Sequence, residues 1–111
     1  MSDSGFAAAF ESIAIEAYKH AVNKGFHDEP RHPAVLIALV HSELSEALEA
    51  LRRPGPDDHI PEFQGVEAEL ADVIIRIADM AGLLGLRVGE AVEAKLAYNK
   101  TRPMRHGGKL F

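Results

Sequence analysis

Four acidic residues occur in the sequence as two pairs with the same spacing, Glu43 with Glu46 and Glu69 with Asp72. Residues three apart on an α-helix lie on the same face, so each pair would direct two carboxylates the same way. Two such helices side by side would bring four carboxylates into one small volume, where bound cations must offset their repulsion. Oxygen ligands without cysteine or an adjacent histidine suit a hard cation, so the pairs predict a site for Mg²⁺, or for Mn²⁺ in its place.

The position of Glu43 favours a site over a solvated helix face, which is the more common reason for a single Glu-x-x-Glu. A carboxylate buried without a partner is costly, so it must be neutralised, paired or bound to a cation. His41 lies two residues earlier and points away from this face, and the Glu-x-x-His pairs of di-iron bundles are absent. On the helical wheel, Glu43 stands among apolar residues, namely Leu36, Leu39, Val40, Ala47 and Ala50.

Helical spacing of apolar residues predicts four helices that would position these acids. The connection over residues 53–65, with its three prolines, is predicted to lack structure of its own, and such long connections are often functional. No stretch alternates with a period of two, so the predicted class is all-α. The helices are predicted to span residues from after the N-cap Ser4 to about 23, from 33 or 34 to 51 or 52, from about 66 to 84, and from about 87 to 99 or 100.

The composition bounds the classes of protein to consider. A chain of 111 residues forms one domain, here residues 1–111 with a basic C-terminal tail at about 101–111. The net charge of −5 argues against nucleic-acid binding. No apolar run approaches the length of a membrane span and no basic signal region opens the chain, so we expect a cytoplasmic protein that binds no membrane.

Cationic residues gather in the last predicted helix and beyond it. Lys95 and Asn99 are four residues apart, and Arg102 follows them. Arg76, one turn after Asp72, would either form an ion pair with that aspartate or contact an anionic ligand. Each residue alone suits a solvated helix end, but together with four acids they suggest the two halves of a metal–polyphosphate site.

The arrangement of the acidic pairs, with a spacer of 22 residues between Glu46 and Glu69, resembles the signature of the MazG-like all-α nucleoside triphosphate pyrophosphohydrolases. Residues 41–49 (HSELSEALE) and 69–76 (ELADVIIR) are also similar to sequences of this family. The resemblance covers nearly the whole chain from about residue 24 to 109. It includes the pattern Lys95-x-x-Tyr98-Asn99-x-x-Arg102-Pro103.

The resemblance implies a four-to-five-helix bundle that binds Mg²⁺ through Glu43, Glu46, Glu69 and Asp72. The expected reaction is hydrolysis of a ribo- or deoxynucleoside triphosphate between the α and β phosphates, which gives the monophosphate and pyrophosphate. The metal would offset transition-state charge and orient the attacking water, and Glu43 or Glu46 would take the water's proton. Removal of aberrant nucleotides is the role that the family suggests.

Further residues are assigned to the substrate through the same resemblance. Lys95 and Asn99 match positions that contact phosphates or sugar in relatives, and Arg102 and Arg76 are added as candidates. Some relatives stack the base on tryptophan, which this chain lacks, so the base contact is predicted at Phe26 or His27.

Two other functions fit the same sequence. A phosphoribosyl-ATP pyrophosphatase shares the fold and a related acidic motif, although the segment around Asn99 favours nucleotide cleaning. A non-enzymatic helical module that binds a partner would leave the acids solvated. The chain is also expected to form a homodimer or homotetramer, because Ile75 and Ala78 lie off the main apolar stripe of their helix and family members usually assemble with sites near subunit interfaces.

Overall fold

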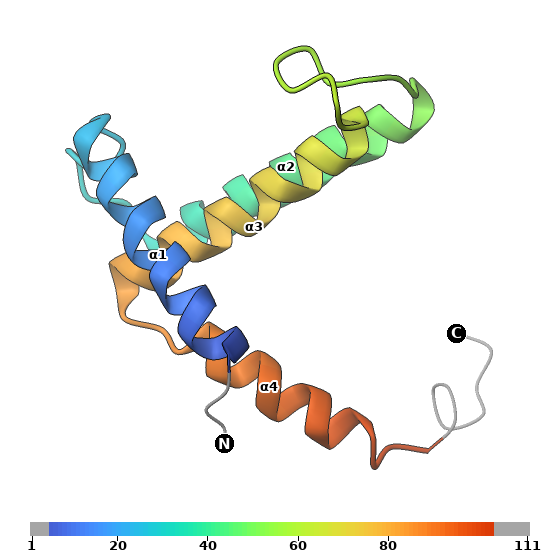
Figure 1. Ribbon diagram of the computed structural model, residues 1–111. Helices are drawn as coiled ribbons and strands as arrows, with labels where there is room; N and C mark the ends of the chain where they lie inside the picture. Colours follow the sequence, from blue (N-terminus) through green and yellow to red (C-terminus); the bar gives the residue numbers. More distant parts are fainter. Residues whose placement is uncertain (1–4, 104–111) are drawn as a thin grey trace.

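The computed structural model describes residues 5–103, which form four helices. Within this range the chain has no strand, only an isolated bridge between Pro56 and Gln64, so the predicted all-α class is confirmed. The predicted helix ends agree within one residue, whereas the expected N-cap Ser4 and residues 104–111 of the basic tail lie outside the described part. The helices are α1 (Gly5–Asn23), α2 (Pro33–Arg52), α3 (Gly65–Leu84) and α4 (Val88–Asn99) (Figure 1).

Helices α2 and α3 lie side by side as an antiparallel hairpin whose ends follow from local sequence (Figure 1). At the start of α2, the imidazole Nδ1 of His32 accepts a hydrogen bond from the N–H of Ala34 at 3.0 Å. At the start of α3, the N–H of Gln64 donates to the carboxylate of Glu67 at 2.8 Å, as in a capping box. Gly85 ends α3 with φ +67°, a left-handed conformation that glycine adopts without strain.

The connection between α2 and α3 has a hydrogen-bonded structure of its own. The carboxylate of Asp57 accepts the N–H groups of His59 and Ile60 at 2.9 and 3.0 Å. The N–H of Asp57 donates in turn to the carbonyl oxygen of Phe63 at 2.8 Å. The connection therefore contains no helix or strand, as predicted, but an aspartate that caps the following amides closes the loop on itself.

Helix α1 crosses the C-terminal half of α3 and covers its second apolar face. Phe10 and Ala14 of α1 form a buried cluster with Ala78 and Ala81 of α3. Ala78 has no exposed surface, so its predicted role in an interface between subunits is wrong: α1 covers it within the chain. Ile75 remains half-exposed.

Helix α4 packs on α1 and extends away from the α2–α3 hairpin (Figure 1). The close approach depends on Gly89, where a Cβ atom would lie 3.0 Å from the Cβ of Phe10. Glu93 accepts a hydrogen bond at 3.2 Å from the N–H of Ala7, one of the amides left free at the start of α1. The radius of gyration is 16.4 Å, above the roughly 13 Å of a compact chain of this length, so the fold is open. None of the helices within residues 5–103 is long and apolar enough to cross a bilayer.

Candidate functional site

The two acidic pairs face each other across the α2–α3 hairpin. Near the loop, a Cβ atom at Gly65 would lie 3.7 Å from the Cβ of Ala50, which fixes the antiparallel register. Seven residues from this contact along each helix, Glu43 lies level with Asp72. Carboxylate oxygens of Glu43, Glu69 and Asp72 all lie within 4.8 Å of one another. We call these three residues the acidic cluster.

Glu46, the fourth predicted ligand, lies beside the acidic cluster. By the same register it is level with Glu69, and its negative charge is among the causes that raise the pKa of Glu69. The residue is exposed, and it is not among the three whose oxygens meet within 4.8 Å. The structure therefore brings three of the predicted ligands together and places the fourth at their edge.

Arg76 contacts the acidic cluster directly, but through a different acid from the one predicted. Its Nε lies 2.7 Å from an oxygen of Glu43 on the neighbouring helix. The i, i+4 pair with Asp72, one of the two roles considered for Arg76, is replaced by this cross-helix pair, although the Arg76 charge still lowers the pKa of Asp72. The side chains of Glu43 and Arg76 are 16% and 42% exposed, so the carboxylate is the more enclosed partner.

Two carboxyls of the acidic cluster have raised pKa values because they are partly buried and negative charges crowd together there. Partial burial raises the pKa of Glu69 most, and the charges of Asp72 and Glu43 raise it further. Burial followed by the charge of Glu43 raises the pKa of Asp72. Asp57 of the connecting loop adds to the negative field at both carboxyls. A donor set of clustered, mutually repelling carboxylate oxygens fits a hard divalent cation, which would stabilise their charged forms.

This crowding predicts a pH-dependent stability of the metal-free protein. A pKa raised in the folded state contributes stability below the ordinary values of 4.5 for Glu69 and 3.8 for Asp72, and this stability is lost as the pH rises through the raised values. We therefore expect Glu69→Gln to melt at increasingly higher temperature than wild type as the pH rises from 4 towards 7 in a chelator. Thermal melts by circular dichroism test this, and a difference that does not change with pH would contradict it.

The opposite shift at Asp57 provides the control for that measurement. The N–H groups of His59 and Ile60 lower the pKa of Asp57. Its contribution to stability is therefore present above its ordinary value of 3.8 and is lost as the pH falls through the lowered value. Asp57→Asn should consequently lose stability relative to wild type as the pH rises from strongly acidic values, a trend of the opposite sign.

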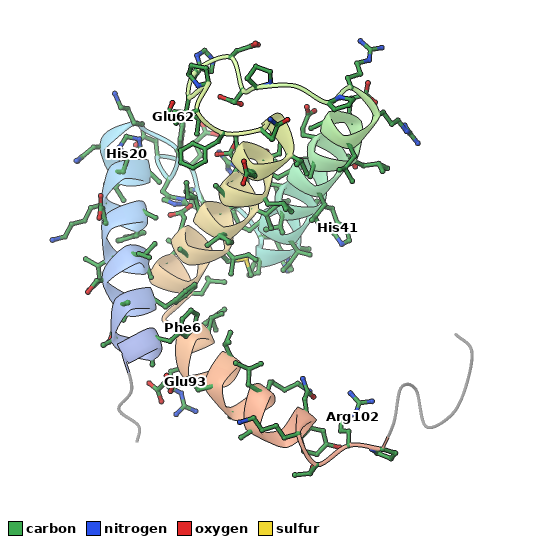
Figure 2. All side chains as sticks on the ribbon, turned by 45° about the vertical axis from the view of Figure 1, so that its right-hand side comes forward. Phe6, His20, His41, Glu62, Glu93 and Arg102 are labelled. Atoms are coloured by element: carbon green, nitrogen blue, oxygen red, sulfur yellow. The ribbon has the colours of Figure 1, made fainter. Side chains whose placement is uncertain are left out.

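The predicted phosphate-binding residues of α4 do not meet the acidic cluster within one chain. Lys95, Asn99 and Arg102 are all exposed. Lys95 lies over the ring of Tyr98, with its Nζ 5.3 Å from the ring centre. Figure 2 shows Arg102 just beyond the far end of α4, well away from α2 and α3.

The two residues predicted to contact a base have different environments. Phe26 is 56% exposed and so presents a free aromatic surface. The Nε2 of His27 instead lies 2.8 and 3.0 Å from the two carboxylate oxygens of Asp79 on α3. Its ring also lies 5.8 Å from that of Tyr18, measured between ring centres. His27 thus ties the α1–α2 connection to α3, which leaves Phe26 as the better placed of the two for a ligand.

A hollow of about 910 Å³ lies away from the acidic cluster, between α1, the C-terminal end of α3 and the start of α4. Small and apolar residues form much of its lining, including Ala14, Ala81 and Gly89, and none of the four paired acids belongs to it. The acidic cluster instead lies on the face where α2 and α3 meet.

Comparison with known proteins identifies a relative of the chain. No family model matches the chain, and no solved structure matches it. Among curated proteins, the chain is similar to a dATP/dGTP diphosphohydrolase of cyanophage S-2L, with 35% identity over 88 residues. The matched region covers 79% of this chain and 69% of the phage protein. The chain therefore belongs to the same family as this phage dATP/dGTP diphosphohydrolase.

Proposed function

We propose that the chain is a Mg²⁺-dependent nucleoside triphosphate pyrophosphohydrolase of the MazG-like type. It would hydrolyse a nucleoside triphosphate between the α and β phosphates and release the monophosphate and pyrophosphate. The observation that carries this proposal is the meeting of Glu43, Glu69 and Asp72 within 4.8 Å across two helices, in a relative of a dATP/dGTP diphosphohydrolase. The name of that relative also favours a purine deoxynucleotide as substrate, with cleaning of the nucleotide pool as the biological role.

The acids divide into metal ligands and a proton acceptor. Glu43, Glu69 and Asp72 would hold Mg²⁺ or Mn²⁺, with Glu46 at the edge of the site. When bound, the cation supplies charge neutralisation at the phosphates and lowers the pKa of a water. Glu46 is exposed and lies outside the cluster, so its carboxylate is available to take the proton of the attacking water. Glu43 is the alternative base, although its oxygen is already paired with Arg76.

The phosphates require cations that the acidic cluster lacks. We assign this role to Lys95, Asn99 and Arg102 of the α4 region, together with Arg76. Because α4 extends away from the hairpin, we propose that the protein is a homodimer or homotetramer in which α4 of one subunit completes the site of another. The exposed apolar side chains along the helices support such an assembly, among them Val35, Ile37, Leu44, Leu48, Ile74, Ile75 and Leu96.

A product analysis tests the proposed reaction. The protein is incubated with Mg²⁺ and, in separate reactions, with phosphoribosyl-ATP and with a panel of ribo- and deoxynucleoside triphosphates that includes dATP and dGTP, and the products are separated by ion-exchange chromatography. We expect monophosphate and pyrophosphate in equal amounts, with no turnover in a chelator. Diphosphate with orthophosphate would indicate a different hydrolase, and turnover of phosphoribosyl-ATP alone would favour the histidine-pathway alternative.

A binding measurement separates the enzyme from a non-enzymatic helical module. If the acids form a metal–nucleotide site, Mg²⁺ with a non-hydrolysable nucleotide should raise the melting temperature, because ligands that bind only the folded state stabilise it. A module whose acids are merely solvated would show no such increase.

A further inference from the structure

We propose that Arg76 pairs with Glu43 in the metal-free protein and leaves it when a metal binds there. The freed guanidinium of Arg76 would then bind the triphosphate. This exchange rests on the proposed function and goes beyond it, because it assigns Arg76 opposing effects on the binding of metal alone and of metal with nucleotide. Arg76 would then be a substrate-binding residue that couples the binding of the two ligands.

Arg76 and a metal would compete for the same carboxylate. The Nε of Arg76 lies 2.7 Å from an oxygen of Glu43, and the same carboxylate contributes to the acidic cluster. A divalent cation held by this carboxylate would stand close to the guanidinium. Two cations at this separation repel, so metal binding would weaken the ion pair and favour its opening.

Of the two partners, Arg76 has more freedom to move away. Glu43 is 16% exposed and is held on a helix that packs against α3, whereas Arg76 is 42% exposed. An arginine side chain has several rotatable bonds, so its guanidinium can leave Glu43 without moving the helix. Metal binding would therefore change the position of Arg76 and leave the carboxylates in place.

The released guanidinium would find a new partner close by. Arg76 follows Asp72 by one helical turn, so it stays at the edge of the metal site after it leaves Glu43. A triphosphate bound to the metal offers oxygen acceptors at that edge, and a guanidinium binds phosphate through paired hydrogen bonds. The metal alone must displace Arg76 without compensation, whereas metal with nucleotide gives Arg76 a new partner. The two ligands would therefore bind cooperatively.

Isothermal titration calorimetry of the full chain with Mn²⁺ alone tests the exchange by measuring the affinity for Mn²⁺. We compare wild type with Arg76→Gln, which removes the competing charge, and with Arg76→Lys, which retains a charge. Arg76→Gln should bind Mn²⁺ about tenfold more tightly than wild type in the absence of nucleotide. Arg76→Lys should remain close to wild type. A non-hydrolysable nucleotide should increase Mn²⁺ affinity strongly in wild type and much less in Arg76→Gln.

The outcomes separate this inference from the proposed function. If Arg76→Gln binds Mn²⁺ equally or more weakly than wild type, Arg76 is a structural ion-pair partner and the exchange is overturned while the metal site stands. If neither protein binds Mn²⁺, both the metal site and the exchange are overturned. Should Arg76→Gln lose its helical circular dichroism, Arg76→Met takes its place in both titrations. Tighter binding of Mn²⁺ alone with weaker coupling to the nucleotide supports the exchange, and an Mn²⁺ affinity equal to or below that of wild type overturns it.

Discussion

Glu43→Gln is expected to lower kcat/KM for nucleotide hydrolysis at least about a hundredfold, since even indirect partners of metal ligands contribute ten- to a hundredfold. The substitution keeps the size of the side chain and removes the charge of Glu43, the member of the acidic cluster that pairs with Arg76. Without that charge, the two remaining carboxylates would hold a divalent cation weakly. Steady-state kinetics with Mg²⁺ and dATP or dGTP give the measurement, and an unchanged far-ultraviolet circular dichroism spectrum shows that the helices remain.

A matched control is present on the same helix. Glu49 is also on α2, but it pairs with Arg52 and Arg53 outside the acidic cluster. Glu49→Gln should retain wild-type activity, so a general effect of charge loss on α2 is separated from loss of the metal site. Asp72→Asn should behave like Glu43→Gln, because it removes another member of the cluster. Full activity in either Glu43→Gln or Asp72→Asn would contradict the assignment of the site.

Much of the hairpin and its acids could be predicted because the determining interactions are local. Proline and histidine start α2, glycine ends α3, and apolar spacing gives the length of each helix. The wheel placed Glu43 towards the core-facing side of α2, and its side chain is indeed only 16% exposed. Helix ends and apolar faces are set by residues within a few turns of one another, so a single sequence contains these signals, although spacing did not identify the partner of Arg76.

The contacts between helices could not be read in the same way. The Arg76–Glu43 pair joins residues 33 positions apart, and the His27–Asp79 pair joins residues 52 apart. Each depends on the register and crossing of helices, which many other contacts set together. The wheel of α3 showed that Ala78 lies off the main stripe, but it could not tell whether α1 or a second subunit covers it. The path of α4 could not be predicted for the same reason. Gly89 allows α4 to pack closely on α1, but a glycine in the sequence does not tell which helix it will contact.

The loop between α2 and α3 lies between these two cases, because the sequence contained a signal for its hydrogen bonds. Pro56-Asp57-Asp58 is a typical start of a turn in which an aspartate caps the next amides. The prolines of the connection indicated a loop but not which of its residues would form hydrogen bonds. The consequence for the site is that Asp57 adds negative charge at Glu69 and Asp72, which no spacing of helical acids would have indicated.

The path of α4 leads to a second large effect, the recovery of activity when two inactive variants are mixed. Glu43 is on the hairpin, whereas Lys95 is on α4, which extends away from it. If α4 of one subunit completes the site of another, a hybrid of Glu43→Gln and Lys95→Ala chains contains one site with both native residues. Random pairing in a dimer makes half of the molecules hybrids, each with one intact site of two, so about a quarter of wild-type activity should return.

Co-expression with two affinity tags isolates the hybrids, whose activity is compared with that of each parent. Because one site of two is intact in each purified hybrid, about half of wild-type activity is expected there, against about a quarter in the unselected mixture. The control is a hybrid of Glu43→Gln with Asp72→Asn. Both residues belong to the acidic cluster of one chain, so every site in that hybrid carries a defect and no activity should return. Recovery in both hybrids would indicate that the acids themselves come from two subunits. Without recovery in the Lys95→Ala hybrid, α4 cannot complete a neighbouring site, and the phosphates must be held by Arg76 and other residues of the hairpin's own chain.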